Sequence, residues 1–109
     1  MKLLLHSIMI VVTQDERILI DKVEKKVCEY FGVPCQKIIN RDMTAQVSLA
    51  RGYIFYILHN DYGLSIGKIT TIYLRKKRVV FWHISKIKEL LKQKMYKGIY
   101  DEICANDIK

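Results

Sequence analysis

The sequence contains few acidic residues, few cysteines and no long apolar run, and each scarcity excludes a class of protein. Its 109 residues include 11 Asp and Glu against 19 Lys and Arg, which gives a formal net charge of +8. A small domain this basic more often binds a polyanion than not, with nucleic acid the first candidate and an anionic membrane surface the second. Half of the residues are apolar, so we expect one folded domain rather than a disordered chain.

The three cysteines are too few and too scattered to hold the fold together. Cys28, Cys35 and Cys104 are an odd number and contain no Cys-x-x-Cys pair. They therefore exclude a closed disulfide framework and a recognisable zinc site. A reducing cytoplasm is the expected compartment. Cys28 and Cys104 stand among apolar neighbours, so we expect buried inert thiols rather than nucleophiles.

Catalysis and cofactor binding find little support in the sequence. There is no Gly-x-x-x-x-Gly-Lys-Ser/Thr phosphate loop, and His6, His59 and His83 do not share a spacing typical of metal ligands. His83 lies in a basic segment, where a phosphate contact or a structural role is expected rather than chemistry. The sequence predicts no enzyme, no cofactor and no metal.

The N-terminal residues 1–12, MKLLLHSIMIVV, are basic and then apolar. The run is too short for a transmembrane helix, and no membrane association is expected. It lacks the small-x-small cleavage site of a signal peptide, which is the alternative interpretation. We expect this segment to pack on the domain or to join two chains as a homodimer. Residues 13–109 are then the single helical domain.

Helical signals follow one another along the rest of the chain, and no period-2 strand pattern competes with them. Thr13 and Glu16 have capping-box spacing, and Gly32 is a natural C-cap before a short helix that ends near residue 40. The next apolar stripe contains Val47, Ala50, Ile54, Ile57 and Leu58. Ser65 is expected to cap a helix over residues 66–73. A basic helix then follows to about residue 94, and Gly98 is expected to separate it from a last helix over 99–105.

The basic segment RKKRVVFWHISK, residues 75–86, is the most informative stretch of the chain. At about 100° per residue, Val80, Ile84, Ile87 and Leu91 fall on one stripe, which is expected to be buried. The opposite stripe contains Arg75, Arg78, Val79, Trp82 and Lys86. A cationic outward face of this kind suits the major groove of DNA, and with the preceding short helix it predicts a helix-turn-helix. The alternative is that these cations form only a solvated surface.

In order and spacing, four segments resemble the C-terminal DNA-binding domain of the bacterial chromosomal replication initiator DnaA. They are VEKKVCEYFGVPCQKIINRD, VSLARGYIFYIL, LSIGKITTIYL and RKKRVVFWHISKI, and the resemblance as a whole extends from about residue 17 to residue 91. The last one occupies the place of the family's Arg-Asp-His-Ser/Ala-Thr-Val signature. The resemblance implies an all-α, multi-helix domain with a helix-turn-helix, of the kind found in DnaA C-terminal and Trp-repressor-like proteins. It also implies that Arg51 enters the minor groove.

The sequence departs from the family where the DNA bases are recognised. Lys76 replaces the family's aspartate, Lys77 its histidine, Val79 its threonine and Thr70 a glycine. Two lysines add attraction to phosphates at the expense of hydrogen bonds to base edges, so the family's DNA box is not the expected target. The ATPase portion of the initiator has no counterpart in the segments that carry the resemblance.

The sequence therefore predicts a protein that binds double-stranded DNA, replication-initiator-like but without an ATPase domain. Arg78 or Lys77 is expected to contact guanine, Val79 a thymine methyl group, and Lys76 and Lys86 phosphates. The complete expected DNA-binding surface consists of Arg51, Arg75, Lys76, Lys77, Arg78, Val79, Trp82 and Lys86. Two alternatives remain at this point: a protein interaction module with Trp82 as its hot spot, and a domain that binds structured RNA.

Overall fold

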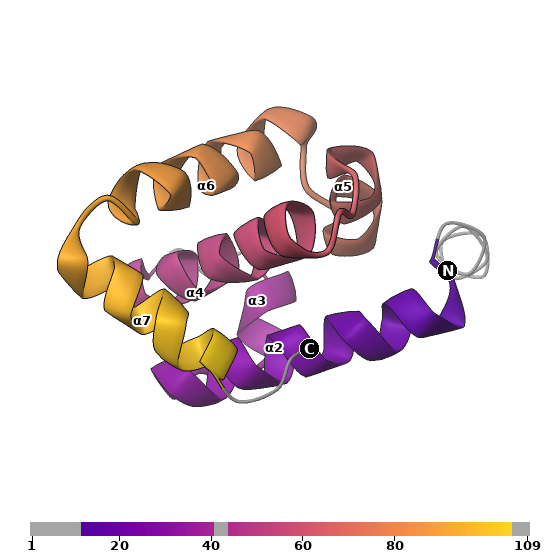
Figure 1. The fold of residues 1–109 in the computed structure, drawn as a ribbon. Coiled ribbons are helices and arrows are strands. Elements are labelled where there is room, and N and C mark those ends of the chain that lie inside the picture. Colours follow the sequence, from indigo (N-terminus) through magenta and orange to yellow (C-terminus); the bar gives the residue numbers. More distant parts are fainter. Residues whose placement is uncertain (1–11, 41–43, 106–109) are drawn as a thin grey trace.

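The computed structural model describes residues 12–40 and 44–105, and this part of the chain is helical throughout, without a strand. The all-α prediction is confirmed. The helices shown in Figure 1 are α2 (Gln14–Phe31), α3 (Gln36–Ile39), α4 (Ala45–Tyr56), the π-helical η1 (Ile57–Asp61), α5 (Ile66–Tyr73), α6 (Lys77–Leu90) and α7 (Lys94–Ala105). The expected packing of the N-terminal segment concerns residues outside the described ranges, apart from Val12, which is buried.

Both ends of α2 follow the local signals in the sequence. The Thr13 hydroxyl accepts from the Glu16 amide and the Glu16 carboxylate accepts from the Thr13 amide, each at 3.1 Å. These two bonds satisfy amides that the first helical turn leaves without partners. At the other end Gly32 has φ 65°, a left-handed conformation that a residue without a Cβ adopts at little cost. The predicted cap at each end is confirmed.

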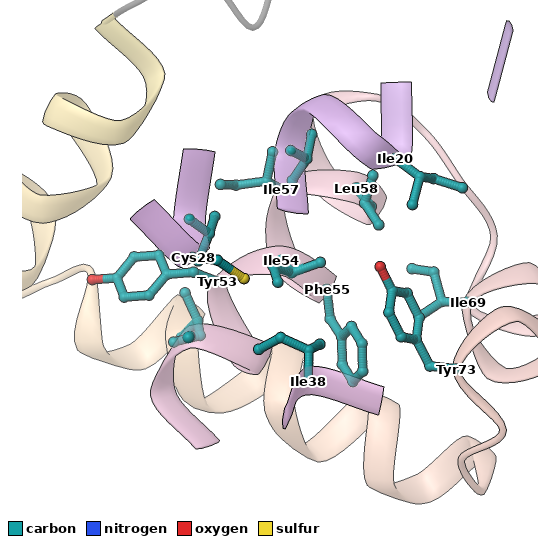
Figure 2. Close-up of a cluster of buried hydrophobic side chains, with 14 of the residues drawn as sticks. Ile20, Cys28, Ile38, Tyr53, Ile54, Phe55, Ile57, Leu58, Ile69 and Tyr73 are labelled. Atoms are coloured by element: carbon teal, nitrogen blue, oxygen red, sulfur yellow. The ribbon is translucent and has the colours of Figure 1, made fainter. Parts of the chain in front are cut away.

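The core forms around α4, which lies between α2 and α6 in Figure 1. The predicted stripe is buried along its whole length, from Val47 to Leu58, because η1 continues the direction of α4. Figure 2 shows the aromatic part of this core, where the rings of Phe55 and Tyr73 lie 5.0 Å apart between centroids. The Tyr73 hydroxyl donates to the Glu24 carboxylate, so the one polar atom of this buried ring is paired.

Helices α5 and α6 are joined by a turn of three residues, Leu74 to Lys76. The Ser65 hydroxyl accepts from the Lys68 amide at 3.1 Å, which confirms the predicted cap of α5. Leu74 ends α5 in a left-handed conformation at φ 55°, and the chain is extended at Lys76 before α6 begins at Lys77. Two helices linked by a tight turn therefore stand where the sequence predicts them.

The C-terminal part differs from the prediction. Helix α6 ends at Leu90 rather than near residue 94, and α7 runs from Lys94 to Ala105 with Gly98 inside it. The break is a tight turn in which the Lys92 amide donates to the Glu89 carbonyl and the Gln93 amide to the Leu90 carbonyl. The turn lets α7 fold back so that Ile103 is buried in the core. Gly98 lowers the helical propensity of α7 only slightly. The burial of the apolar face of α7 outweighs that small cost.

Helices α4 and α6 approach closely at Gly52. A Cβ atom at this position would lie 2.9 Å from Cγ1 of Ile87, inside van der Waals contact. Gly52 is itself buried, and so is Ile87. The absence of a side chain at residue 52 therefore sets how near α6 lies to the central helix.

Candidate nucleic-acid interface

Helix α6 has a buried and an exposed face, as the sequence predicts, but Leu91 of the expected buried stripe lies just beyond the helix and is half-buried. Val80, Ile84 and Ile87 are buried against the rest of the domain. The opposite side is exposed apart from Val79, which is half-buried. We call this side the outer α6 face, defined as Lys77, Arg78, Val79, Phe81, Trp82, Ser85 and Lys86.

Cations gather at the N-terminal end of α6. Lys76 occupies the N-cap position and Lys77 and Arg78 follow it, and all three are exposed. The first turn contains no acidic residue, and no side chain caps it. The N-terminus of a helix carries a partial positive charge, so each cation there costs about 0.3–1 kcal/mol at low ionic strength. This arrangement is unfavourable in isolation, and an anion placed at this end would relieve it.

Trp82 lies on the outer face with 52% of its surface exposed, which confirms its predicted partial exposure. The Lys86 ammonium lies 4.9 Å from the centroid of the indole, at cation–π distance. On its inner side the indole contacts the His83 ring edge-on at 5.0 Å between centroids. Trp82 and Lys86 therefore form one unit in which the charge and the ring hold each other in place.

Phe81 is a member of the outer face that sequence reasoning missed. Its side chain is 59% exposed, more than that of Trp82. The signal was present in the sequence, because residue 81 is turned by about 100° from the buried Val80 and lies off the apolar stripe. Ser85 was missed in the same way, and it lies on the same line of the helix as Arg78.

The structure contradicts the placement expected of Arg51. Its side chain is buried inside the domain with 1% of its surface exposed. Nε donates to the Ile38 carbonyl at 2.8 Å, and Nη2 donates to the carbonyls of Lys37 and Asn40 at 2.9 Å each. A minor-groove contact would break these bonds and leave buried carbonyls unpaired, which is costly. Arg51 is therefore a structural residue that holds the end of α3.

Arg75 also differs from its expected place on the outward stripe. It precedes α6, in the turn that follows α5, and is only half-exposed. Its guanidinium donates to the carbonyls of Tyr73 at 3.1 Å, Ile38 at 3.2 Å and Asn40 at 2.6 Å. Because the chain is not yet helical at residue 75, the helical spacing used in the sequence analysis does not apply to it.

His83 faces inward, where it is 4% exposed and packs edge-on against Phe55 with 5.5 Å between ring centroids. Burial lowers the pKa of His83 to about 4, and the positive charges of Arg51, Arg75 and Lys86 act in the same direction. The imidazole is therefore neutral at physiological pH. Of the two roles expected from the sequence, the structural one fits this position.

The outer face continues on one side into a hollow between α4 and α6. It has a volume of about 470 Å³, and its walls include Ser48 and Leu49 from α4 and Trp82 and Lys86 from α6. Tyr96 from α7 closes one end. The cationic face is therefore not flat but stands beside a partly apolar groove.

Within residues 12–40 and 44–105, no three His, Cys, Asp or Glu side chains come together in a way that could hold a metal ion. Burial raises the pKa of the Cys28 thiol to about 12, and a hydrogen bond with Cys35 acts in the same direction, while Cys35 itself is exposed. Thus the predicted burial holds for Cys28, whereas Cys104 is half-buried. No helix within the described ranges has both the length and the apolar character needed to cross a membrane.

Comparison with known proteins gives one distant similarity. No family model matches the chain, and no solved structure matches it. A stretch of 70 residues, 64% of this chain, is 31% identical to the chromosomal replication initiator protein DnaA of Pseudothermotoga lettingae. The match covers 16% of the length of that DnaA protein, so the chain matches only a small part of it. The chain is therefore similar to a small part of a DnaA protein, in agreement with the resemblance in its sequence.

Proposed function

We propose that this protein binds double-stranded DNA through the outer α6 face, as a helix-turn-helix domain of the replication-initiator kind. The observation that carries the proposal is the accumulation of Lys76, Lys77 and Arg78 at the N-terminus of α6 without an acidic partner in its first turn. That arrangement costs stability in the free protein and is relieved when phosphates approach. The distant similarity to DnaA supports the same partner.

The expected contacts follow from the exposure of each residue. Arg78 is the exposed arginine of the outer face and can place two donors against guanine O6 and N7. Lys76, Lys77 and Lys86 are suited to phosphates, to which an ammonium group is attracted without demands on geometry. Arg51 and Arg75 support this face from behind, since both bind the carbonyls at the end of α3.

The proposal is tested by the salt dependence of binding to a random-sequence duplex. Neutralisation of roughly four to six phosphates makes log K fall against log salt with a slope near −4 to −5. The variant K76A/K77A removes two of the exposed lysines assigned to phosphates, and the slope is expected to become shallower by about 2. The matched control is K22A/K25A, which removes two exposed cations from α2, on the other side of α4 in Figure 1.

Three outcomes of this experiment decide between the proposal and its alternatives. Equal losses in the two double variants indicate that net charge alone causes binding, which contradicts a specific outer face. Absence of binding at low salt excludes a DNA-binding role and favours a protein interaction module. Tighter binding to a structured RNA than to the duplex favours the RNA-binding alternative.

A role in a reducing cytoplasm, without catalysis or a cofactor, remains part of the proposal. It is supported by the three free cysteines, which lie at separate degrees of burial in the structure. Mass measurement of the protein purified without reductant tests it, because oxidation of two thiols to a disulfide lowers the mass by two hydrogen atoms.

A further inference from the structure

The outer α6 face carries two large aromatic side chains side by side in the sequence, and both are exposed. Phe81 is 59% and Trp82 52% exposed. Neighbouring helical residues point about 100° apart, so the two rings lie on either side of the line that joins Arg78 to Ser85. A shallow hollow of about 570 Å³ over this face is lined by Arg78, Val79, Phe81, Trp82 and Ser85.

Two neighbouring side chains contact the indole in the free protein. The Lys86 ammonium lies over the ring and the His83 ring packs against it edge-on. Ordering this side chain on binding therefore costs less entropy than ordering a free one. The arrangement resembles a preformed contact surface more than a residue left exposed by chance.

Such a surface requires an apolar counterpart. The floor of the DNA major groove consists of hydrogen-bond donors and acceptors, and the C5 methyl group of thymine is its apolar feature. An aromatic ring pressed against donors or acceptors removes them from water without replacing their hydrogen bonds, which costs about 1–3 kcal/mol for each group. Against a methyl group the same ring loses nothing and buries apolar surface.

We propose that Phe81 and Trp82 bind thymine methyl groups on either side of the base contacted by Arg78, so that the protein selects thymine-rich major grooves. This inference rests on the proposed DNA-binding function and adds to it the chemical class of the target. It also extends the apolar contact expected of Val79 to two larger side chains that are more exposed.

The test compares two duplexes that differ only in the methyl groups. The probes are a 24-base-pair DNA duplex that repeats thymine–guanine–thymine on one strand and the same DNA duplex with uracil in place of every thymine, whose hydrogen-bonding groups are the same. Burial of one methyl group corresponds to roughly a fourfold change in affinity. The wild-type protein is expected to bind the thymine duplex at least about fourfold more tightly. In F81A and in W82A this ratio is expected to fall by about fourfold, and in the double variant F81A/W82A it is expected to fall further, towards one.

A matched control separates the methyl contact from general weakening. Lys88 is exposed on the same helix, and K88A is expected to weaken binding to both duplexes equally and leave the ratio unchanged. Because Phe81 and Trp82 are exposed, their alanine variants are expected to keep the thermal midpoint of the wild type.

The outcomes distinguish this inference from the function on which it rests. No binding to either duplex contradicts the proposed function itself. Equal binding to both duplexes by the wild type leaves DNA binding intact and overturns the inference. A preference for thymine that is undiminished in F81A/W82A also overturns it, because the methyl groups then act through the shape of the DNA.

Discussion

Arg51 and Arg75 donate hydrogen bonds to the same two carbonyl oxygens, those of Ile38 and Asn40. The distances to the Asn40 oxygen are 2.9 Å from Arg51 and 2.6 Å from Arg75. The carbonyl end of a helix carries partial negative charge, so two guanidinium groups suit the end of α3. Since Arg51 belongs to α4 and Arg75 to the turn before α6, these bonds join three parts of the chain behind the outer α6 face.

Replacement of Arg51 is expected to lower stability rather than DNA affinity alone. R51M keeps the length of the side chain but removes three donors to buried or half-buried carbonyls. We expect a loss of about 3 kcal/mol in the free energy of unfolding, measured by denaturant titration. The control is R78M, which changes an exposed arginine and is expected to stay within about 0.5 kcal/mol of the wild type. If R51M keeps full stability and loses only DNA affinity, the result would contradict the structural role and would support a groove contact for Arg51.

His83 is expected to make stability depend on pH between about 4 and 6.5. Its pKa is lowered to about 4 in the folded protein, against 6.5 as the ordinary value. In this interval the unfolded chain binds the proton and the folded protein does not, so stability is complete above pH 6.5 and falls as the pH falls towards 4. The full loss amounts to about 3 kcal/mol.

The variant H83Q isolates this effect from other titrations. The pKa of Glu24 is raised, chiefly by burial, and that of Glu16 is lowered, chiefly by its hydrogen bond with Lys68. The two carboxyl groups therefore change stability with pH in opposite directions. They are present in both proteins, so the difference between wild type and H83Q reports His83. Parallel stability curves for the two proteins would show that His83 titrates normally.

Trp82 is the one tryptophan of the chain, and its fluorescence reports directly on the outer α6 face. With 52% of its surface exposed, we expect iodide to quench it efficiently in the free protein. Addition of duplex DNA is expected to reduce that quenching, because the ring becomes covered. Acrylamide, which is neutral, serves as a second quencher and excludes an effect of iodide repulsion by DNA. Protection that is absent with both quenchers would place the DNA elsewhere.

The thiols are expected to react in a fixed order. Cys35 is exposed, Cys104 half-buried and Cys28 buried with a pKa of about 12. Because the thiolate is the reactive form, Cys35 is alkylated first and Cys28 last. Peptide mass analysis after short exposure to iodoacetamide measures the order. Rapid alkylation of Cys28 in the folded protein would contradict its burial.

Deletion of residues 1–11 tests the predicted role of the apolar N-terminal segment. Val12, at the edge of the described chain, is buried with 8% exposure. We expect the deletion to lower the thermal midpoint or the oligomeric state, measured by calorimetry and light scattering. A shortened protein of unchanged midpoint and mass would contradict both packing on the domain and dimerisation.

Local signals explain which parts of the fold were predictable. The caps at Thr13, Gly32 and Ser65 depend on residues within one helical turn, and each stands where the sequence places it. The boundary between α6 and α7 does not depend on such a signal. No glycine or proline marks residues 90–93, and the turn there exists because α7 buries Ile103 against the rest of the domain. The spacing of apolar residues along a helix does not predict long-range packing of this kind.

Arg51 shows how a signal can be present and still be misinterpreted. Residue 51 follows Val47 by four positions and precedes Ile54 by three, so the helical pattern places it on the buried stripe. The family resemblance implied an exposed groove contact for it, and the carbonyls that make its burial tolerable come from α3, earlier in the chain. The outer α6 face was more predictable, because Arg78, Trp82 and Lys86 depend on the spacing within a single helix.

A substitution at Gly52, which is buried, would change the position of α6 relative to α4. A methyl group at this position would meet Ile87 at 2.9 Å and displace α6 from α4. Every residue of the outer face moves with that helix, although none of them is altered. A change at this one buried position can therefore alter the orientation of Arg78, Phe81 and Trp82 together, without any substitution among the residues that are proposed to contact DNA.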